Sequence, residues 1–140
     1  MQYLCDAPGN RTWFRIETEG EAIVESADMR HAVEKYFRRA LGTAQSSYRP
    51  NPAMGIERDI GLSAHILREM PIFATLRDRE GIALATAMLP PRGLDDSSFR
   101  IIIVGPQNAD PYPGHNDAIC ALGAHFGLAL TRERCFPYAR

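Results

Sequence analysis

The sequence predicts an α+β domain in which two helices pack on one face of an antiparallel sheet of about five to six strands. Two observations favour this fold class. Apolar runs are joined by short turn-forming segments, as in hairpins, and two longer segments carry helical periodicity. A third observation is that strands and helices do not alternate regularly, which disfavours a parallel sheet. The long helix falls in the N-terminal half and the shorter helix near the C-terminal end.

Length and composition bound the class of protein. The 140 residues, 45% of them hydrophobic and 24% charged, predict one packed domain over 1–140. A net charge of −1 provides little attraction for phosphates, so no nucleic-acid partner is expected. The chain shows neither a secretory signal pattern nor an apolar run of about 20 residues, so we expect a cytoplasmic protein without membrane contact. Its three cysteines form no C-x-x-C pair, and no disulfide framework is expected.

The first 48 residues predict a hairpin followed by a long helix. Turn-forming Pro8, Gly9 and Asn10 separate two short strands within the first 20 residues. Thr18 and Glu21 have the spacing of a capping box, in which each side chain accepts a hydrogen bond at a helix start. The helix predicted from there has about 30 residues and ends near Tyr48, because two prolines follow in the expected loop "YRPNPAMG".

The segment 56–68 fits two patterns. Alternation of Ile60, Leu62, Ala64 and Ile66 suits a strand, whereas a four-residue spacing also suits a helix. A glycine inside the run weakens a helix, and the next segment is a strand, so we favour a strand here. The run 72–89 then predicts a hairpin with the polar tip "RDREG".

The C-terminal part predicts one more strand and the second helix. Four branched residues in succession, 101–104, suit a strand in the middle of the sheet that is covered on both faces. The last helix is expected to begin near 114–116 and to end at about Leu130. Gly123 and Gly127 give this helix a slim surface on which backbone can approach closely.

Catalytic-type residues are densest where this strand meets the last helix. Asp110, His115 and Asp117 are therefore the candidate catalytic residues, with His115 as hydrogen-bond donor or general base near free N–H groups of the helix start. The alternative is that Asp117 stabilises the first helical turn through the helix dipole, without any function.

Candidate ligand-binding residues are Arg100, Tyr112 and His115. Arg100 begins the predicted central strand and would point into a cavity between sheet and helix, where its guanidinium suits an anion. Tyr112 lies between two prolines, which would present its ring outward. His31 and His65 are expected to be solvated. No H-E-x-x-H pattern is present, and we expect neither a metal nor another cofactor.

The hairpin "LRDREGIALATAML" and the order of elements are similar to small sensor domains of the PAS, GAF and roadblock type. No cofactor cysteine or ligand motif of those families falls on this sequence, so we assign the chain to none of them.

The leading hypothesis for function is a bacterial-type cytoplasmic, non-enzymatic module that binds a small ligand or a partner protein. It would form a homodimer through an exposed strand or the long helix. A second hypothesis is a small hydrolase or isomerase with His115 as base, Asp110 or Asp117 to orient it, and Arg100 to hold an anionic substrate. A third is a structural or interaction protein without a pocket.

Overall fold

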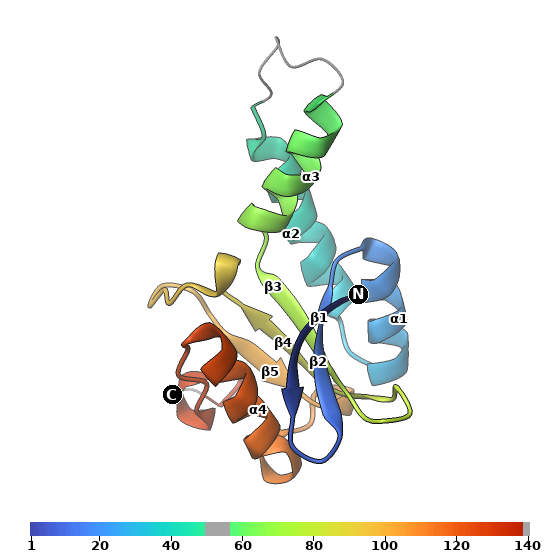
Figure 1. Ribbon diagram of the computed structural model, residues 1–140, viewed down its shortest axis with the longest axis vertical. Helices are drawn as coiled ribbons and strands as arrows, with labels where there is room; N and C mark the ends of the chain where they lie inside the picture. The colour runs from blue at the N-terminus through green and yellow to red at the C-terminus, as the bar shows by residue number, and fades with distance from the viewer. Residues whose placement is uncertain (50–56, 139–140) are drawn as a thin grey trace.

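The computed structural model describes residues 1–49 and 57–138, which form a five-stranded antiparallel sheet with helices on both faces (Figure 1). The strand order follows the chain, and every neighbouring pair is antiparallel. The strands are β1 (Gln2–Ala7), β2 (Arg11–Ile16), β3 (Ile72–Arg77), β4 (Ala83–Leu89) and β5 (Ile102–Val104).

Within the described residues, four α-helices accompany the sheet: α1 (Glu19–Met29), α2 (Val33–Ser47), α3 (Glu57–Glu69) and α4 (Tyr112–Phe126). The same residues form the short 3-10 helices η2 (Pro91–Gly93), η3 (Pro106–Asn108) and η4 (Arg132–Arg134).

The α+β class and the antiparallel sheet are confirmed, while the placement of the helices differs from the prediction. Successive side chains of β3 point to opposite faces of the sheet. Phe73 packs into a core cluster with α1 and α2, whereas Ala74 and Leu76 pack into a second cluster with α4. The sheet therefore lies between two helical layers, and its two faces have separate cores.

Both predicted hairpins are present. Gly9 and Asn10 have φ angles of 75° and 57°, so the β1–β2 turn uses the left-handed backbone region that these residue types tolerate. At the β3–β4 turn, Asp78 Oδ1 accepts hydrogen bonds from the backbone N–H groups of Glu80 and Ile82. The polar tip of this hairpin is therefore held by one aspartate side chain.

The predicted helix of about 30 residues is two helices, α1 and α2. The capping box of Thr18 and Glu21 starts α1 as expected. The helix then ends at Arg30, which adopts left-handed φ and ψ angles of 54° and 52°. Ser26 stabilises this break twice, because its carbonyl accepts from His31 N–H and its hydroxyl accepts from Glu34 N–H. The chain turns there without the glycine or asparagine that usually marks a helix end.

The segment for which we favoured a strand is helix α3, so that prediction is wrong. Ile66 packs against the core cluster of α1 and α2, and Met70, four residues later, is buried in it. This contact fits the four-residue spacing that the sequence also showed, and it overrides the propensity of Gly61. The predicted end of α2 at Tyr48 is confirmed. The loop expected after it, 50–56, lies outside the described residues.

Strand β5 lies at the edge of the sheet, not in its middle as predicted. Its outer side is covered by the C-terminal tail, because Phe136 N–H donates to Ile101 C=O and Ile103 N–H donates to Phe136 C=O. The apolar run at 101–104 is thus explained by a tail that replaces a neighbouring strand. An apolar run reports burial and does not say what covers the strand.

Helix α4 begins earlier and ends earlier than predicted, at Tyr112 and Phe126. His115 departs from helical geometry with a φ of −134°, and Gly127 closes the helix in the left-handed region. Of the two glycines expected to allow a close approach, Gly123 does so, since a Cβ atom there would lie 2.6 Å from the carbonyl oxygen of Leu128. At Gly127 that expectation is wrong, because nothing lies within 4 Å of the same position.

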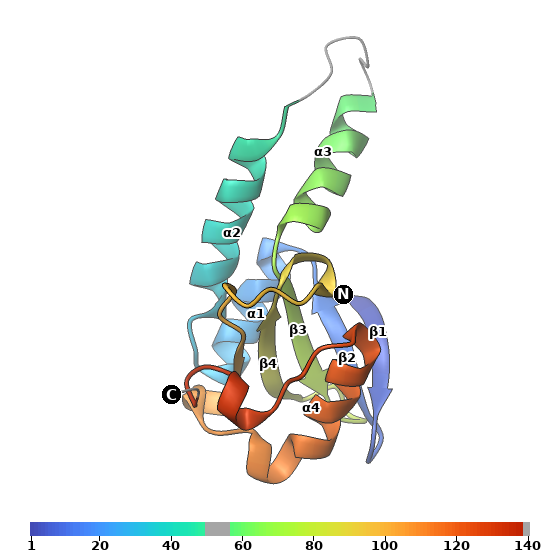
Figure 2. The ribbon, with the colours of Figure 1, turned by 90° about the vertical axis from the view of Figure 1, so that its left-hand side faces the viewer.

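Helices α2 and α3 extend from one end of the sheet and lie side by side in both views (Figures 1 and 2). His65 helps to join them, because its Nε2 lies 2.8 Å from Ser47 Oγ and its ring packs against Tyr48. This histidine, expected to be solvated, is half-buried. Among the helices that the structure describes, none has the length and apolar character to cross a bilayer.

Candidate functional site

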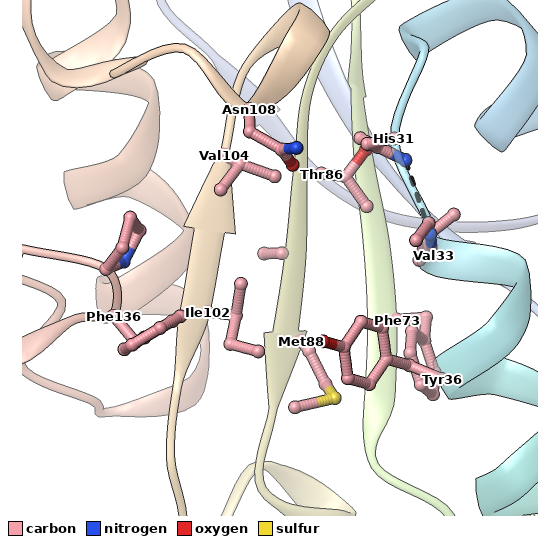
Figure 3. Close-up of a pocket in the computed structure, with 13 residues that line it drawn as sticks. His31, Val33, Tyr36, Phe73, Thr86, Met88, Ile102, Val104, Asn108 and Phe136 are labelled. Carbon is pink, nitrogen blue, oxygen red and sulfur yellow. Dashed lines mark hydrogen bonds between the residues drawn. The ribbon is translucent and has the colours of Figure 1, made fainter.

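A pocket of about 290 Å³ lies on the face of the sheet that α1 and α2 cover (Figure 3). Its floor is built by two strands. Thr86 pairs with Val104 across β4 and β5, and Met88 pairs with Ile102, so the four side chains stand in two rows on one face. The pocket exists because the α1–α2 layer does not extend over the whole of this edge of the sheet.

The walls come from segments that are distant in sequence. On one side lie His31, Ala32, Val33 and Tyr36, from the α1–α2 junction and the first turn of α2. On the other side, Phe136 and Pro137 of the C-terminal tail stand over β5. The same tail that covers the edge of β5 therefore supplies one wall of the pocket.

One end of the pocket is polar and rests on a buried chain of hydrogen bonds. His31 Nε2 lies 2.8 Å from Thr86 Oγ1, which donates to Glu25 Oε2 over 2.5 Å. Glu25 Oε1 accepts from Arg77 at 2.7 Å. Glu25 is fully buried and the Arg77 side chain is 14% exposed, so this ion pair joins a buried side chain to one that retains some contact with water.

The hydrogen-bond pattern assigns the proton of His31. Its Nδ1 accepts from Val33 N–H at 3.4 Å, so Nε2 carries the hydrogen and donates it to Thr86. Burial lowers the pKa of His31 below its ordinary value of 6.5, and the nearby Glu25 carboxylate opposes this shift. The ring is therefore neutral at pH 7, with both nitrogens engaged.

Asn108 completes the polar end from the loop that follows β5. In Figure 3 its amide points toward Thr86 across the end of the pocket. Within the described residues this amide has no hydrogen-bond partner, so it offers both a donor and an acceptor to a bound molecule.

The residues predicted to be catalytic lie elsewhere. On the opposite helical layer, Arg11 donates to His115 Nδ1 at 2.8 Å and to Asp117 Oδ1 at 2.7 Å. The Arg11 side chain is 12% exposed and also donates to the Pro8 carbonyl. Burial and the Arg11 charge lower the pKa of His115. This arrangement fastens the β1–β2 turn to the start of α4.

The other predicted site residues make no hydrogen bond to His115 or Asp117 within the described part of the chain. Asp110 accepts from the Tyr112 N–H and from Arg132, and it makes no hydrogen bond to His115. The Tyr112 ring, expected to point outward, is 5% exposed, and its hydroxyl donates to the Leu130 carbonyl. Burial raises the pKa of Tyr112. Both residues therefore hold the loop and the C-terminal segment together.

Arg100 is the predicted ligand-binding residue that comes nearest to the pocket wall. Its guanidinium carbon lies 4.8 Å from the centroid of the Phe136 ring, one of the lining side chains. Arg100 itself is exposed and does not line the pocket. It stabilises the position of Phe136 through a cation–π contact.

The polar end of the pocket was not predicted from the sequence, and His31, expected to be solvated, is half-buried. One signal was available. Ala22, Ser26 and Met29 form the buried stripe of α1 with a spacing of three and four residues, and Glu25 falls on that stripe. A glutamate on an apolar helical face indicates a buried partner. The partners of Glu25 are Thr86 and Arg77, and which residues these are depends on the pairing of strands that are distant in the sequence.

Within the described part of the chain, no three side chains of His, Cys, Asp or Glu are grouped to hold a metal ion. Comparison of the chain with protein families, curated proteins and solved structures gives no match. The geometry of the pocket is therefore the basis on which a function can be proposed.

Proposed function

We propose that the protein is a non-enzymatic module that binds a small molecule in the pocket between α2, β4, β5 and the C-terminal tail. The observation that carries this proposal is the composition of the lining, in which apolar side chains surround a few polar groups at one end. Small-molecule sites have this character, with apolar walls for affinity and a few polar atoms for orientation.

The size of the pocket fits a small ligand. Its volume of about 290 Å³ lies at the lower end of the range of about 300 to 1,000 Å³ that is typical of ligand sites. A molecule of one or two rings would fill it. Hydrogen bonds from Thr86 to Glu25 and from His31 to Thr86 join the sheet to the α1–α2 segment at its base, and a pre-formed base lowers the entropic cost of binding.

The hydrogen bonds of the polar end favour binding over catalysis. A general base needs a lone pair directed at the substrate, and a nucleophile needs a base beside it. Here both nitrogens of His31 are engaged, and the Thr86 hydroxyl donates its proton to Glu25. Glu25 is in turn paired with Arg77. These groups bond to one another, and the Asn108 amide remains as the group that can donate or accept a hydrogen bond to a ligand.

A pair of tryptophan variants tests the proposal. Ile102→Trp fills the pocket from its floor, and Ile82→Trp adds the same side chain at the exposed tip of the β3–β4 hairpin. Thermal-shift screening against a metabolite library should give compounds that raise the melting temperature of the wild type and of Ile82→Trp. Those compounds should not stabilise Ile102→Trp. Equal stabilisation of both variants by every active compound would contradict binding in this pocket.

We also propose that the homodimer expected from the sequence forms through the α2–α3 surface. Two features of the sheet support this choice over a strand edge. At one edge of the sheet, β1 carries a bulge between Tyr3 and Cys5. At the other edge, β5 is covered by the C-terminal tail. Both features hinder the pairing of an edge strand with a second copy of the chain. Light scattering that shows a monomer at high protein concentration would contradict the dimer.

A further inference from the structure

The chemistry of the lining also defines which ligands this pocket accepts. We propose that its ligand is an uncharged, flat, ring-containing molecule with one hydrogen-bonding group that lies at the end formed by His31, Thr86 and Asn108. This inference rests on the proposed function, since it specifies the ligand class of the same pocket.

Aromatic side chains determine the preference for a flat ring. Tyr36 comes from α2, Phe73 from β3 and Phe136 from the tail, so three rings from three segments surround the same space. Tyr36 and Phe136 are 45% and 41% exposed, which leaves ring surface uncovered at the rim of the pocket. Rings present large, rigid apolar faces, and a flat aromatic ligand can stack on them or meet them edge to face.

The polar end matches a single neutral group. The Thr86 hydroxyl donates to Glu25 and accepts from His31, which leaves one of its two lone pairs for a ligand donor. The Asn108 amide can donate and accept at the same end. A carboxamide or a hydroxyl group can satisfy both residues at once.

The charges behind this end disfavour an ionic ligand of either sign. The Glu25 carboxylate lies directly behind Thr86 and is paired with Arg77 at 2.7 Å. Because each charge of this pair already has its counterion, neither an anion nor a cation at this end gains a free partner. None of the residues described as lining the pocket is Arg, Lys, Asp or Glu. An ion would therefore lose its hydration without gaining a counterion.

Arg100 is the charged residue next to the pocket that bears on this preference. Its contact with the outer wall, Phe136, places a guanidinium beside the pocket although it does not line it. If Arg100 turned toward the ligand, an anion would be preferred, as in the second hypothesis from the sequence. The experiment must therefore compare ligands that differ in charge and share one shape.

Three naphthalene probes meet this condition: 2-naphthamide, 2-naphthoate and the 2-naphthamidinium ion. Titration followed by the backbone amide signals of Thr86 and Val104 gives a dissociation constant for each probe. The indole N–H of Trp13 serves as an internal reference, because it is buried on the α4 side of the sheet and donates to Ala118 C=O. We expect 2-naphthamide to bind at least about tenfold more tightly than either ion, a difference expected when buried charge is unpaired.

The outcomes separate the two proposals. Equal or tighter binding of naphthoate or naphthamidinium at the Thr86 signals would overturn the neutral ligand class and leave binding in the pocket intact. If none of the probes shifts these signals and none of the library compounds separates Ile102→Trp from Ile82→Trp, both the ligand class and the proposed function are overturned.

A charge variant tests the assignment of the polar end. Asn108→Asp keeps the size of the side chain. Residue 108 has a φ of 60°, and aspartate tolerates this left-handed backbone conformation as asparagine does. It should weaken the amide probe and strengthen the amidinium probe, each by about tenfold. Asn116→Asp, at an exposed position on α4, is the matched control and should change neither affinity. Unchanged affinities in Asn108→Asp would overturn the placement of the polar group.

Discussion

Thr86 on β4 donates a 2.5 Å hydrogen bond to the fully buried carboxylate of Glu25 on α1. This contact joins the sheet to the helical layer above it. The same hydroxyl lies 2.8 Å from His31 Nε2 at the α1–α2 junction, so one side chain serves both the packing of α1 and the polar end of the pocket. Stability and ligand binding therefore depend on a common set of hydrogen bonds.

We predict that Thr86→Val destabilises the protein by about 1–3 kcal/mol, because Glu25 Oε2 and His31 Nε2 each lose their hydrogen-bond partner. The matched variant is Thr75→Val, on the paired position of β3. Thr75 is also buried, but its hydroxyl serves a single contact, from Arg77 Nε at 3.1 Å. Urea unfolding of both variants should show the larger loss for Thr86→Val. Equal losses would mean that the link between His31 and Glu25 adds nothing to stability.

We predict that Glu25→Gln lowers the free energy of unfolding by about 3 kcal/mol, as expected when one partner of a buried ion pair is removed. The amide keeps the shape of the side chain but loses the charge that balances Arg77. Glu80→Gln, at the exposed hairpin tip, is the control and should have little effect. Chemical unfolding of the two variants measures the difference. A Glu25→Gln protein as stable as the wild type would show that the ion pair is energetically neutral.

A third prediction concerns pH. Since burial lowers the pKa of His31 in the folded state, the unfolded chain binds a proton at this residue first as the pH falls below 6.5. The His31 contribution to stability is then present above pH 6.5 and declines from there to the lower, folded pKa. We expect the free energy of unfolding of His31→Gln to fall less than that of the wild type between about pH 7.5 and about pH 5. Urea unfolding at several pH values measures this slope.

His115 provides the comparison for this experiment. Its pKa is also lowered by burial and by Arg11, so His115→Gln should remove a separate part of the same pH dependence. The two histidines lie on opposite helical layers, and their effects should add in the double variant. A His31→Gln protein with the full pH dependence of the wild type would contradict the burial of a neutral imidazole at the pocket.

The sequence was sufficient for the elements whose signals are local. The two hairpins and the capping box of Thr18 and Glu21 depend on neighbouring residues, and all are present. The break at Arg30 was not predictable in this way, because its stabilising contacts come from Ser26 and involve no typical helix-ending residue. Helix α3 was misassigned because its short apolar pattern fits both periods.

The candidate site was less predictable than the fold. Residues of catalytic type are dense around His115, yet there they fasten a turn to a helix through Arg11. The pocket, in contrast, collects Tyr36, Thr86 and Phe136 from segments that meet only after the sheet has formed. Local density of polar residues in the sequence indicates where charges occur, and strand pairing decides which of them share a cavity.

The last prediction concerns Gly93 in η2, where the backbone and the packing both require glycine. Its φ angle is +67°, and a Cβ atom there would lie 2.3 Å from Cδ1 of Phe126 on α4. Gly81 at the exposed hairpin tip has a similar φ of +84°, with nothing within 4 Å of the same position. The two glycines therefore share the conformational requirement and differ in the steric one.

Gly81→Ala should cost about 1 kcal/mol, the penalty of a left-handed alanine. Gly93→Ala should cost about 1–3 kcal/mol more, because Phe126 must move out of a packed position between η2 and α4. Urea midpoints at unchanged m-values measure both effects. Equal costs for the two variants would show that the Phe126 ring moves aside freely, and the contact between η2 and α4 would then contribute nothing to the packing on this face of the sheet.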